Sequence, residues 1–298
     1  MRPERNGFTP LEIKISNRRS KKFLTGFTIV ELLTVLAIIA ILMGILVPTI
    51  SFVRNTASEA KQKTQLATID MALMAFKGDY GDYPESNLNE DTEDYGGVQK
   101  LAEALVGWDL LGFHPDSAWR ADGYDKDGGN KTYDPEKKRD EDSDNILDTL
   151  NERVGPYLEL TTANAFTLKQ LFGTVTTDLA LDTYVLCDSF AAKKVTIIGA
   201  SKTITVNAGR PILYYRANTS SKTISIGRTD SRIYNSEDNA ALVELNNPVT
   251  PDPLLSNFYD YIIDPKMTID WPYRPNSYIL ISAGVDGLYG TNDDICNF

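Results

Sequence analysis

The run from Phe27 to Ile50 limits what this chain can fold into more than any other part of its sequence. It reads FTIVELLTVLAIIAILMGILVPTI, and Glu31 is its one charged residue. As an α-helix rising about 1.5 Å per residue, the run would measure roughly 36 Å, which exceeds the hydrocarbon core of a membrane at about 30 Å. The sequence therefore predicts one membrane-spanning helix over about residues 27–50.

The parts of the chain on either side of this run differ in charge. Residues 1–26 contain seven Lys or Arg and two Glu, a net charge of +5; because the whole chain carries −11, residues 27–298 carry −16. Basic flanks stay on the cytoplasmic side of a membrane, so we expect a cytoplasmic N-terminus. The acidic remainder argues against a nucleic-acid partner, since it would repel phosphates.

Two ordinary explanations of an apolar N-terminal run fit this sequence poorly. A secretory signal peptide has a short apolar region closed by an A-x-A-like site, whereas this run is too long and has no such site. A plain anchor gives no reason for Glu31, because a carboxylate inside a spanning helix costs about 2.5–3.5 kcal/mol. The intramembrane glutamate therefore indicates a functional role.

The residues before and inside the run, KKFLTGFTIVE from Lys21 to Glu31, resemble the prepilin cleavage motif of type IV pilins and type II secretion pseudopilins. That family has a basic leader, a glycine, an apolar residue and a glutamate at the fifth mature position. The resemblance implies that a prepilin peptidase cleaves between Gly26 and Phe27 and that Phe27 is N-methylated. Pro48 falls where the family often kinks its helix.

The resemblance also implies how the chain would assemble. The Glu31 carboxylate of one subunit would pair with the new Phe27 amine of a neighbour, which offsets part of the cost of burying each charge. Glu31 would then set subunit register in a filament. The implied partners are other pilin or pseudopilin subunits and an inner-membrane assembly platform. The chain would cross the inner membrane once, with its head in the periplasm or, after assembly, outside the cell.

Beyond Pro48 the sequence predicts that the helix continues to about residue 80, where Gly78, Gly81 and Pro84 are stop signals. An apolar stripe at helical spacing is expected to pack on the head. Met71, Leu73, Met74 and Phe76 are expected in the core. The stripe consists of Val53, Ala57, Ala60, Thr64, Ala67, Met71 and Met74. The expected domains are a cleaved leader at 1–26, the long helix at 27–80 and a globular head at 81–298.

The head is expected to contain a short helix at 98–106 and an antiparallel sheet. Five runs of β-branched or aromatic residues separated by turn residues predict strands at 184–188, 195–198, 203–206, 212–216 and 278–281. A long helix followed by such strands indicates an α+β fold, and pilin-like proteins share that order of elements.

The C-terminal segment, SAGVDGLYGTNDDI from Ser282 to Ile295, resembles the calcium-binding loop of major type II pseudopilins. By that resemblance Asp286 and Asp294 are the first candidate ligands, with Asp293 or Asn292 as additions and backbone carbonyls completing six to eight oxygens. The alternative is an acidic hairpin turn, since Asp-Gly is a common turn dipeptide. A second acidic segment, 140–151, partly matches an EF-hand loop but lacks its glycine and its final glutamate.

The scarce Cys and His residues bear on redox state and catalysis. Cys187 and Cys296 would meet an oxidising compartment if the head is exported, so a disulfide between them is one expectation. His114 is the one histidine and lies in a Gly-Phe-His-Pro sequence that is typical of a turn. A zinc site or a Ser-His-Asp triad would depend on this one imidazole, so we expect His114 to be structural.

Three functions follow from these patterns. The first is a structural filament subunit of a type II secretion pseudopilus, without catalytic residues, that supports protein secretion. The alternative is a type IV pilus or competence pilin whose head mediates adhesion or uptake. The third is a membrane-tethered hydrolase with paired carboxylates. The sequence does not place two carboxylates across a cleft, and the C-terminal loop favours the pseudopilus.

Overall fold

The computed structural model describes residues 28–89, 93–126, 128–129, 131–133, 148–190, 192–198, 203–221, 232–247 and 250–298. Gly26, Phe27 and the first part of the acidic segment at 140–151 lie outside these residues. The chain divides into two units, Met1–Ser51 and Phe52–Phe298, and each is described by itself. We call the second unit the head unit.

The long helix predicted from the sequence is present as α1, Ile29–Tyr80. Thr28 precedes its first turn, and Glu31 in that turn suits the positive end of the helix dipole. The backbone remains helical through Pro48. The helix ends where Gly81 takes a φ of 85°, a conformation that glycine adopts without strain.

The face of α1 that packs in the head unit is not the one expected from the apolar stripe. Leu66, Ile69, Leu73 and Phe76 are buried, whereas Val53, Met71 and Met74 are 58%, 63% and 58% exposed. The predictions of core positions for Leu73 and Phe76 are therefore confirmed, and those for Met71 and Met74 are wrong. The rotation of α1 is set in part by polar contacts. Gln62 and Gln65 lie on the packed face, and their side chains bond to backbone groups of the head unit, so the apolar stripe faces outward.

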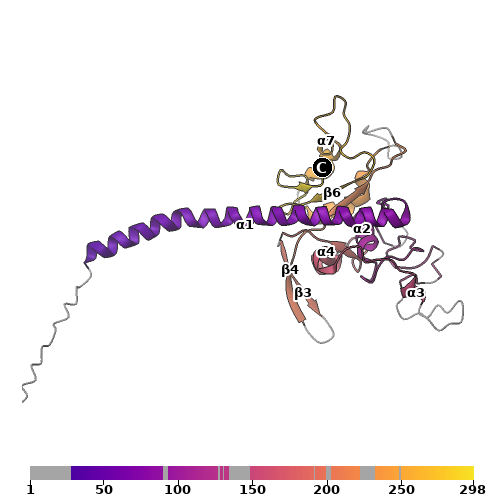
Figure 1. Cartoon of the computed structure of the whole chain (residues 1–298), viewed down its shortest axis with the longest axis horizontal. Helices are drawn as coiled ribbons and strands as arrows, with labels where there is room; N and C mark the ends of the chain where they lie inside the picture. The colour runs from indigo at the N-terminus through magenta and orange to yellow at the C-terminus, as the bar shows by residue number, and fades with distance from the viewer. Residues whose placement is uncertain are drawn as a thin grey trace, which may run out of the picture. The chain divides into compact units, whose positions relative to one another are not determined.

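Short helices make up much of the head unit, and Figure 1 shows them gathered with the strands around the C-terminal half of α1. The predicted helix at 98–106 is confirmed as α2, Gly97–Val106. The others are α3 Asp148–Asn151, α4 Leu160–Ala163, α5 Leu168–Phe172, the 3-10 helix η2 Ser236–Asn239, α6 Ala240–Asn246 and α7 Pro253–Tyr261.

All strand pairs between the described strands are antiparallel, so the fold is α+β, as expected. The strands are β1 Ala165–Thr167, β2 Tyr184–Leu186, β3 Lys193–Ile198, β4 Thr203–Ala208, β5 Leu213–Arg216, β6 Tyr278–Ser282 and β7 Ile295–Cys296. They form a β1-β2 pair, a β3-β4 hairpin and a three-stranded sheet of order β5-β6-β7. A bridge between Cys187 and Pro211 continues β2 alongside the start of β5.

The sheet β5-β6 separates two apolar clusters because successive strand residues point to opposite faces. Tyr214 and Leu280 pack with α1 and α2, while Tyr215 and Ile281 pack with α6 and α7. All ten residues of α2 are buried, including Gln99, Lys100 and Glu103. Its first residue, Gly97, lies so close to the Tyr214 carbonyl that an added Cβ would come within 2.3 Å of that oxygen.

Candidate functional site

The N-terminal part of α1 presents an apolar surface that nothing in the described structure covers. Its large apolar side chains are exposed, for example Ile29 at 78%, Ile41 at 65% and Ile45 at 65%. This helix is long and apolar enough to cross a membrane, and its most apolar stretch of 18 residues contains no buried residue. Such a surface is unfavourable in water at about 25 cal/mol per Å², which is compatible with a helix that spans a membrane.

Glu31, the charged residue of this surface, caps its own helix. Its Oε2 accepts hydrogen bonds from the backbone N–H of Thr28 at 2.9 Å and from the Thr28 hydroxyl group at 2.8 Å. The Thr28 hydroxyl oxygen accepts in turn from the Glu31 N–H at 3.2 Å. This reciprocal pattern is a capping box. The carboxylate therefore lies in the first turn of α1, at the fifth residue after the predicted cleavage point, and both bonds use the same oxygen.

In the head unit, α1 is held by polar contacts as well as by its buried face. Gln62 Oε1 accepts from the Ser189 N–H at 2.7 Å. Gln65 Nε2 donates to the carbonyl oxygens of Thr162 and Cys187 at 3.0 and 2.9 Å. These two glutamine side chains therefore satisfy backbone groups in α4 and just after β2. The contacts fix the rotation of this part of α1 about its own axis within the head unit.

The C-terminal turn uses its carboxylates to hold its own backbone. Asp293 Oδ2 accepts from the N–H groups of Val285 and Asp286 at 2.7 and 2.9 Å. Asp294 Oδ2 accepts from the Gly290 N–H and the Tyr261 hydroxyl group, both at 2.7 Å. Burial raises the pKa of Asp294 to about 6. The pKa of Asp293 is lowered, because the hydrogen bonds it accepts outweigh its burial.

Asp286 and Asn292 complete the set of residues predicted for calcium. Asp286 Oδ1 accepts from the Leu288 N–H at 2.8 Å, and the Asn292 side chain is exposed. Across the described residues, no three His, Cys, Asp or Glu side chains gather in a way that could hold a metal ion. The structure thus brings the four predicted residues into one turn in which three act as caps, and calcium binding stays a prediction.

The turn is also supported by the end of α6, for which the sequence predicted no role. Asn246 Nδ2 donates to the Gly287 carbonyl at 2.9 Å, and Asn247 Nδ2 donates to the Tyr289 carbonyl at 3.2 Å. The Tyr289 N–H returns a bond to Asn247 Oδ1 at 3.1 Å. The Asn-Asn pair at the end of α6 could have been noticed in the sequence, but its partner lies some forty residues away and nothing local identifies it.

The disulfide expected between Cys187 and Cys296 is not formed, and both residues are free thiols. Cys187 is bridged to Pro211, while Cys296 pairs with Ile281 at the far edge of the β5-β6-β7 sheet. Three strand spacings of about 4.8 Å separate them, about 14 Å in all, against the roughly 4.4–6.8 Å that a disulfide spans. Burial raises the pKa of both thiols.

His114 has the structural setting expected for it. The side chain is buried, its Nδ1 accepts from the Asp116 N–H at 3.1 Å, and its Nε2 lies 3.2 Å from Glu152 Oε2. Burial lowers the pKa of the imidazole. The ring thus fixes the turn that contains it.

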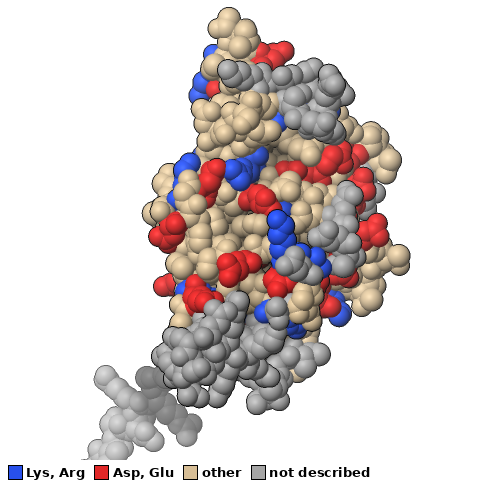
Figure 2. Space-filling model, turned by 90° about the vertical axis from the view of Figure 1, so that its right-hand side faces the viewer, with Lys and Arg blue, Asp and Glu red and all other residues tan. Residues whose placement is uncertain are grey.

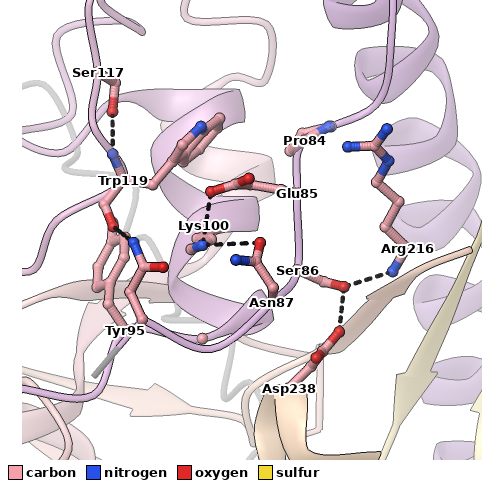
Figure 3. Close-up of polar contacts among 12 residues, drawn as sticks. Pro84, Glu85, Ser86, Asn87, Tyr95, Lys100, Ser117, Trp119, Arg216 and Asp238 are labelled. Carbon is pink, nitrogen blue, oxygen red and sulfur yellow. Dashed lines mark hydrogen bonds and ion pairs between the residues drawn. The ribbon is translucent and has the colours of Figure 1, made fainter. Parts of the chain in front are cut away.

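A polar cluster that sequence reasoning missed lies where the chain leaves α1 and passes α2 (Figure 3). Lys100 on α2 is fully buried, and its ammonium group bonds to Glu85 at 2.9 Å and to Asn87 at 3.3 Å. Beside it, the Ser86 hydroxyl group donates to the Asp238 carboxylate and accepts from the Arg216 N–H. The local signal of this cluster is a lysine in the short helical pattern of α2, which also contains Gln99 and Glu103.

Comparisons with protein-family models, with curated proteins and with solved structures found no match for this chain.

Proposed function

We propose that this chain is a prepilin-type filament subunit with a pilin-like fold, which is cleaved after Gly26, anchored by α1 and assembled through that helix. Within this class we favour the type II secretion pseudopilus, because the C-terminal turn resembles that of its major subunits. The subunit acts by assembly and has no catalytic step. Calcium at the turn is part of this proposal.

One observation carries it: α1 is a single helix with two different environments. Over about residues 29–50 its apolar side chains are uncovered, whereas Leu66, Ile69, Leu73 and Phe76 are buried in the head unit. The uncovered part suits a bilayer first and a bundle of neighbouring helices later, because each excludes apolar surface from water. The buried part ties that element to a folded head.

The position of Glu31 supports the same proposal. Its carboxylate lies in the first turn of α1, four positions along the chain from Phe27, where cleavage would create a new amine. In the monomer Thr28 donates two hydrogen bonds to this carboxylate, which offsets part of the cost of placing it in the membrane while its charge still lacks an oppositely charged partner. In a filament, the amine of a neighbouring subunit would replace or join Thr28 as its partner.

Mass spectrometry of the protein from native membranes, with and without co-expressed prepilin peptidase, tests the proposal. We expect a peptidase-dependent species that begins at Phe27 and is about 14 Da heavier from one methyl group. Gly26→Val should abolish cleavage. The chain offers a matched control, because Gly7-Phe8-Thr9 repeats Gly26-Phe27-Thr28 away from the apolar run. Gly7→Val should be processed normally, and an intact N-terminus in the presence of the peptidase would refute the proposal.

A further inference from the structure

The hairpin of β3 and β4 has two open edges. It projects from the head unit in Figure 1, and its six residue pairs run from Lys193 opposite Ala208 to Ile198 opposite Thr203. Among the described residues, neither strand makes a backbone hydrogen bond to a segment outside the hairpin. Unpaired N–H and C=O groups along an edge are a template for a further strand, and a two-stranded ribbon is only marginally stable by itself.

The edge of β4 is the less protected of the two. Proteins guard edge strands with lysines, prolines or elements that cover them. β3 begins with Lys193 and Lys194, and the Lys193 ammonium group donates to the Leu171 carbonyl of α5, which packs against this strand. In contrast, β4 contains no charged residue and no proline, although 24% of the chain is charged. The edge of β4 is therefore the one open to a partner.

The two faces of the hairpin differ in polarity, which limits how a further strand can pair. Val195 and Ile197 of β3 lie opposite Val206 and Ile204 on one face, whereas the residues between them form a polar face. Val195 is buried, but Ile204, nearer the end of the hairpin, is 40% exposed. The apolar face thus extends beyond the part of the head that covers it. An added strand has to alternate in step with β4 to continue this face.

Charge indicates the kind of partner that can approach the hairpin. Residues 189–208, which include both strands, contain three lysines and no acidic residue, although residues 27–298 together carry −16. Figure 2 shows acidic side chains at many places on the face that it draws. A basic hairpin on an acidic head is complementary to the head of a second copy of this chain, since opposite potentials attract.

We propose that β4 pairs antiparallel with β4 of a second copy, which gives a four-stranded sheet across a two-fold axis. Thr205 lies opposite Thr205 of the partner subunit, so that Ile204 meets the partner's Val206 and the apolar residues stay on one face. The Thr203 end of each basic hairpin then points toward the acidic head of the other copy. Such an isologous contact closes at two copies, so it differs from the repeating contacts of a filament and goes beyond the proposed function.

Oxidative cross-linking of the full chain in detergent, with copper phenanthroline as the oxidant, tests this contact. Thr205→Cys should give a disulfide-linked dimer, because Cβ atoms directly opposite each other in a strand pair lie about 4.5–5.5 Å apart. Thr196→Cys is the matched control: Thr196 lies opposite Thr205 within the hairpin and is also exposed, but it belongs to β3. The yield of linked dimer should be several-fold higher for Thr205→Cys, and wild type sets the background from its own two cysteines.

Two further measurements test the register and the partner. A mixture of Thr203→Cys and Asn207→Cys chains should cross-link, whereas either variant alone should not, because these positions lie opposite each other only between copies. Thr205→Lys should raise the Kd of the dimer by about five-fold, since it places like charges opposite each other; sedimentation equilibrium measures the Kd. An equal yield of dimer from Thr196→Cys, or no linked dimer from Thr205→Cys, would overturn the proposal.

Discussion

The hydroxyl group of Tyr278 donates a 2.7 Å hydrogen bond to Asp70 Oδ1, which joins the central strand β6 to α1. Asn297 Nδ2 donates to the same oxygen at 3.1 Å, and Arg274 lies 3.4 Å from Oδ2. The Asp70 carboxylate on α1 therefore contacts the central strand, the segment before that strand and the segment after β7. These contacts fix the position of this part of α1 along its axis relative to the sheet.

Tyr278→Phe should lower the free energy of unfolding of the head by about 1–2 kcal/mol, because it removes a bond to a charged acceptor and leaves the ring packing intact. Urea unfolding of the detergent-solubilised chain, followed by near-UV circular dichroism, measures the change. Tyr83→Phe is the control: its ring packs on Tyr278 with centroids 4.7 Å apart. Equal losses in the two variants would contradict the role assigned to the Asp70 bond.

Leu73→Ala should destabilise the head by about 2–5 kcal/mol. Leu73 lies on the face of α1 that packs in the core and is fully buried there, so the truncation leaves a cavity. Met74→Ala, on the next residue but 58% exposed, should change stability by less than about 0.5 kcal/mol. The same unfolding measurement checks both. A larger effect at Met74 would mean that the apolar stripe, and not the observed face, packs on the head.

Lys100 and Glu85 should respond unequally to substitution. Lys100→Met replaces a buried ammonium group by an apolar chain of similar length and leaves Glu85, whose side chain is 36% exposed, free to be hydrated. We expect a change within about 1 kcal/mol. Glu85→Gln leaves the Lys100 charge buried with a neutral partner and should cost about 2–3 kcal/mol. Thermal unfolding compares them, and a greater loss for Lys100→Met would refute this account.

Asp188 should make the head less stable as pH rises. Burial raises its pKa to about 7, although it accepts bonds from the N–H groups of Arg210 and Phe190 and from the Ser282 hydroxyl group. Because the folded-state pKa exceeds the unfolded value of about 3.9, the folded chain holds this proton more tightly. Its contribution is complete below about pH 4 and is lost as pH rises through about 7.

Asp188→Asn isolates this effect, because the asparagine oxygen can keep both backbone bonds. The stability difference between wild type and variant should shift by about 2–4 kcal/mol between pH 4 and pH 8, with the wild type losing stability relative to the variant. Urea unfolding at several pH values measures it. Parallel pH profiles for the two proteins would show that Asp188 does not titrate in this range.

Calcium should raise the unfolding temperature of the wild-type chain by a few degrees at saturating concentration, if the C-terminal turn binds it as proposed. Asp286→Asn should abolish the shift. Asp264→Asn is a close control, because Asp264 Oδ1 accepts from the Lys266 N–H as Asp286 Oδ1 accepts from the Leu288 N–H. No shift in wild type, or equal loss in both variants, would leave the turn as a capped loop without a metal.

The long helix and the strands could be read from the sequence because each depends on local patterns. An apolar run of this length is typical of a helix long enough to cross a membrane, and β-branched runs between turn residues produced all five predicted strands. The turn at Asp286–Asp294 was located by its resemblance to a calcium-binding loop, which was recognisable because its glycines and aspartates are close in sequence. At Gly284 a Cβ would come within 2.3 Å of the Asp293 carbonyl, which ties that glycine to the turn.

Tertiary structure decided the features that depend on partners far apart in the chain. The rotation of α1 follows from Gln62 and Gln65 meeting backbone groups of residues more than ninety positions away, so the apolar stripe faces outward. The strand order β5-β6-β7 keeps Cys187 and Cys296 apart, and sequence spacing contains no measure of that distance. A cavity beside Arg216 and Arg232 has the same origin, because residues 85–87 form its wall together with residues that lie more than a hundred positions further along the chain. Local periodicity determines which element forms, whereas the satisfaction of buried polar groups determines how those elements meet.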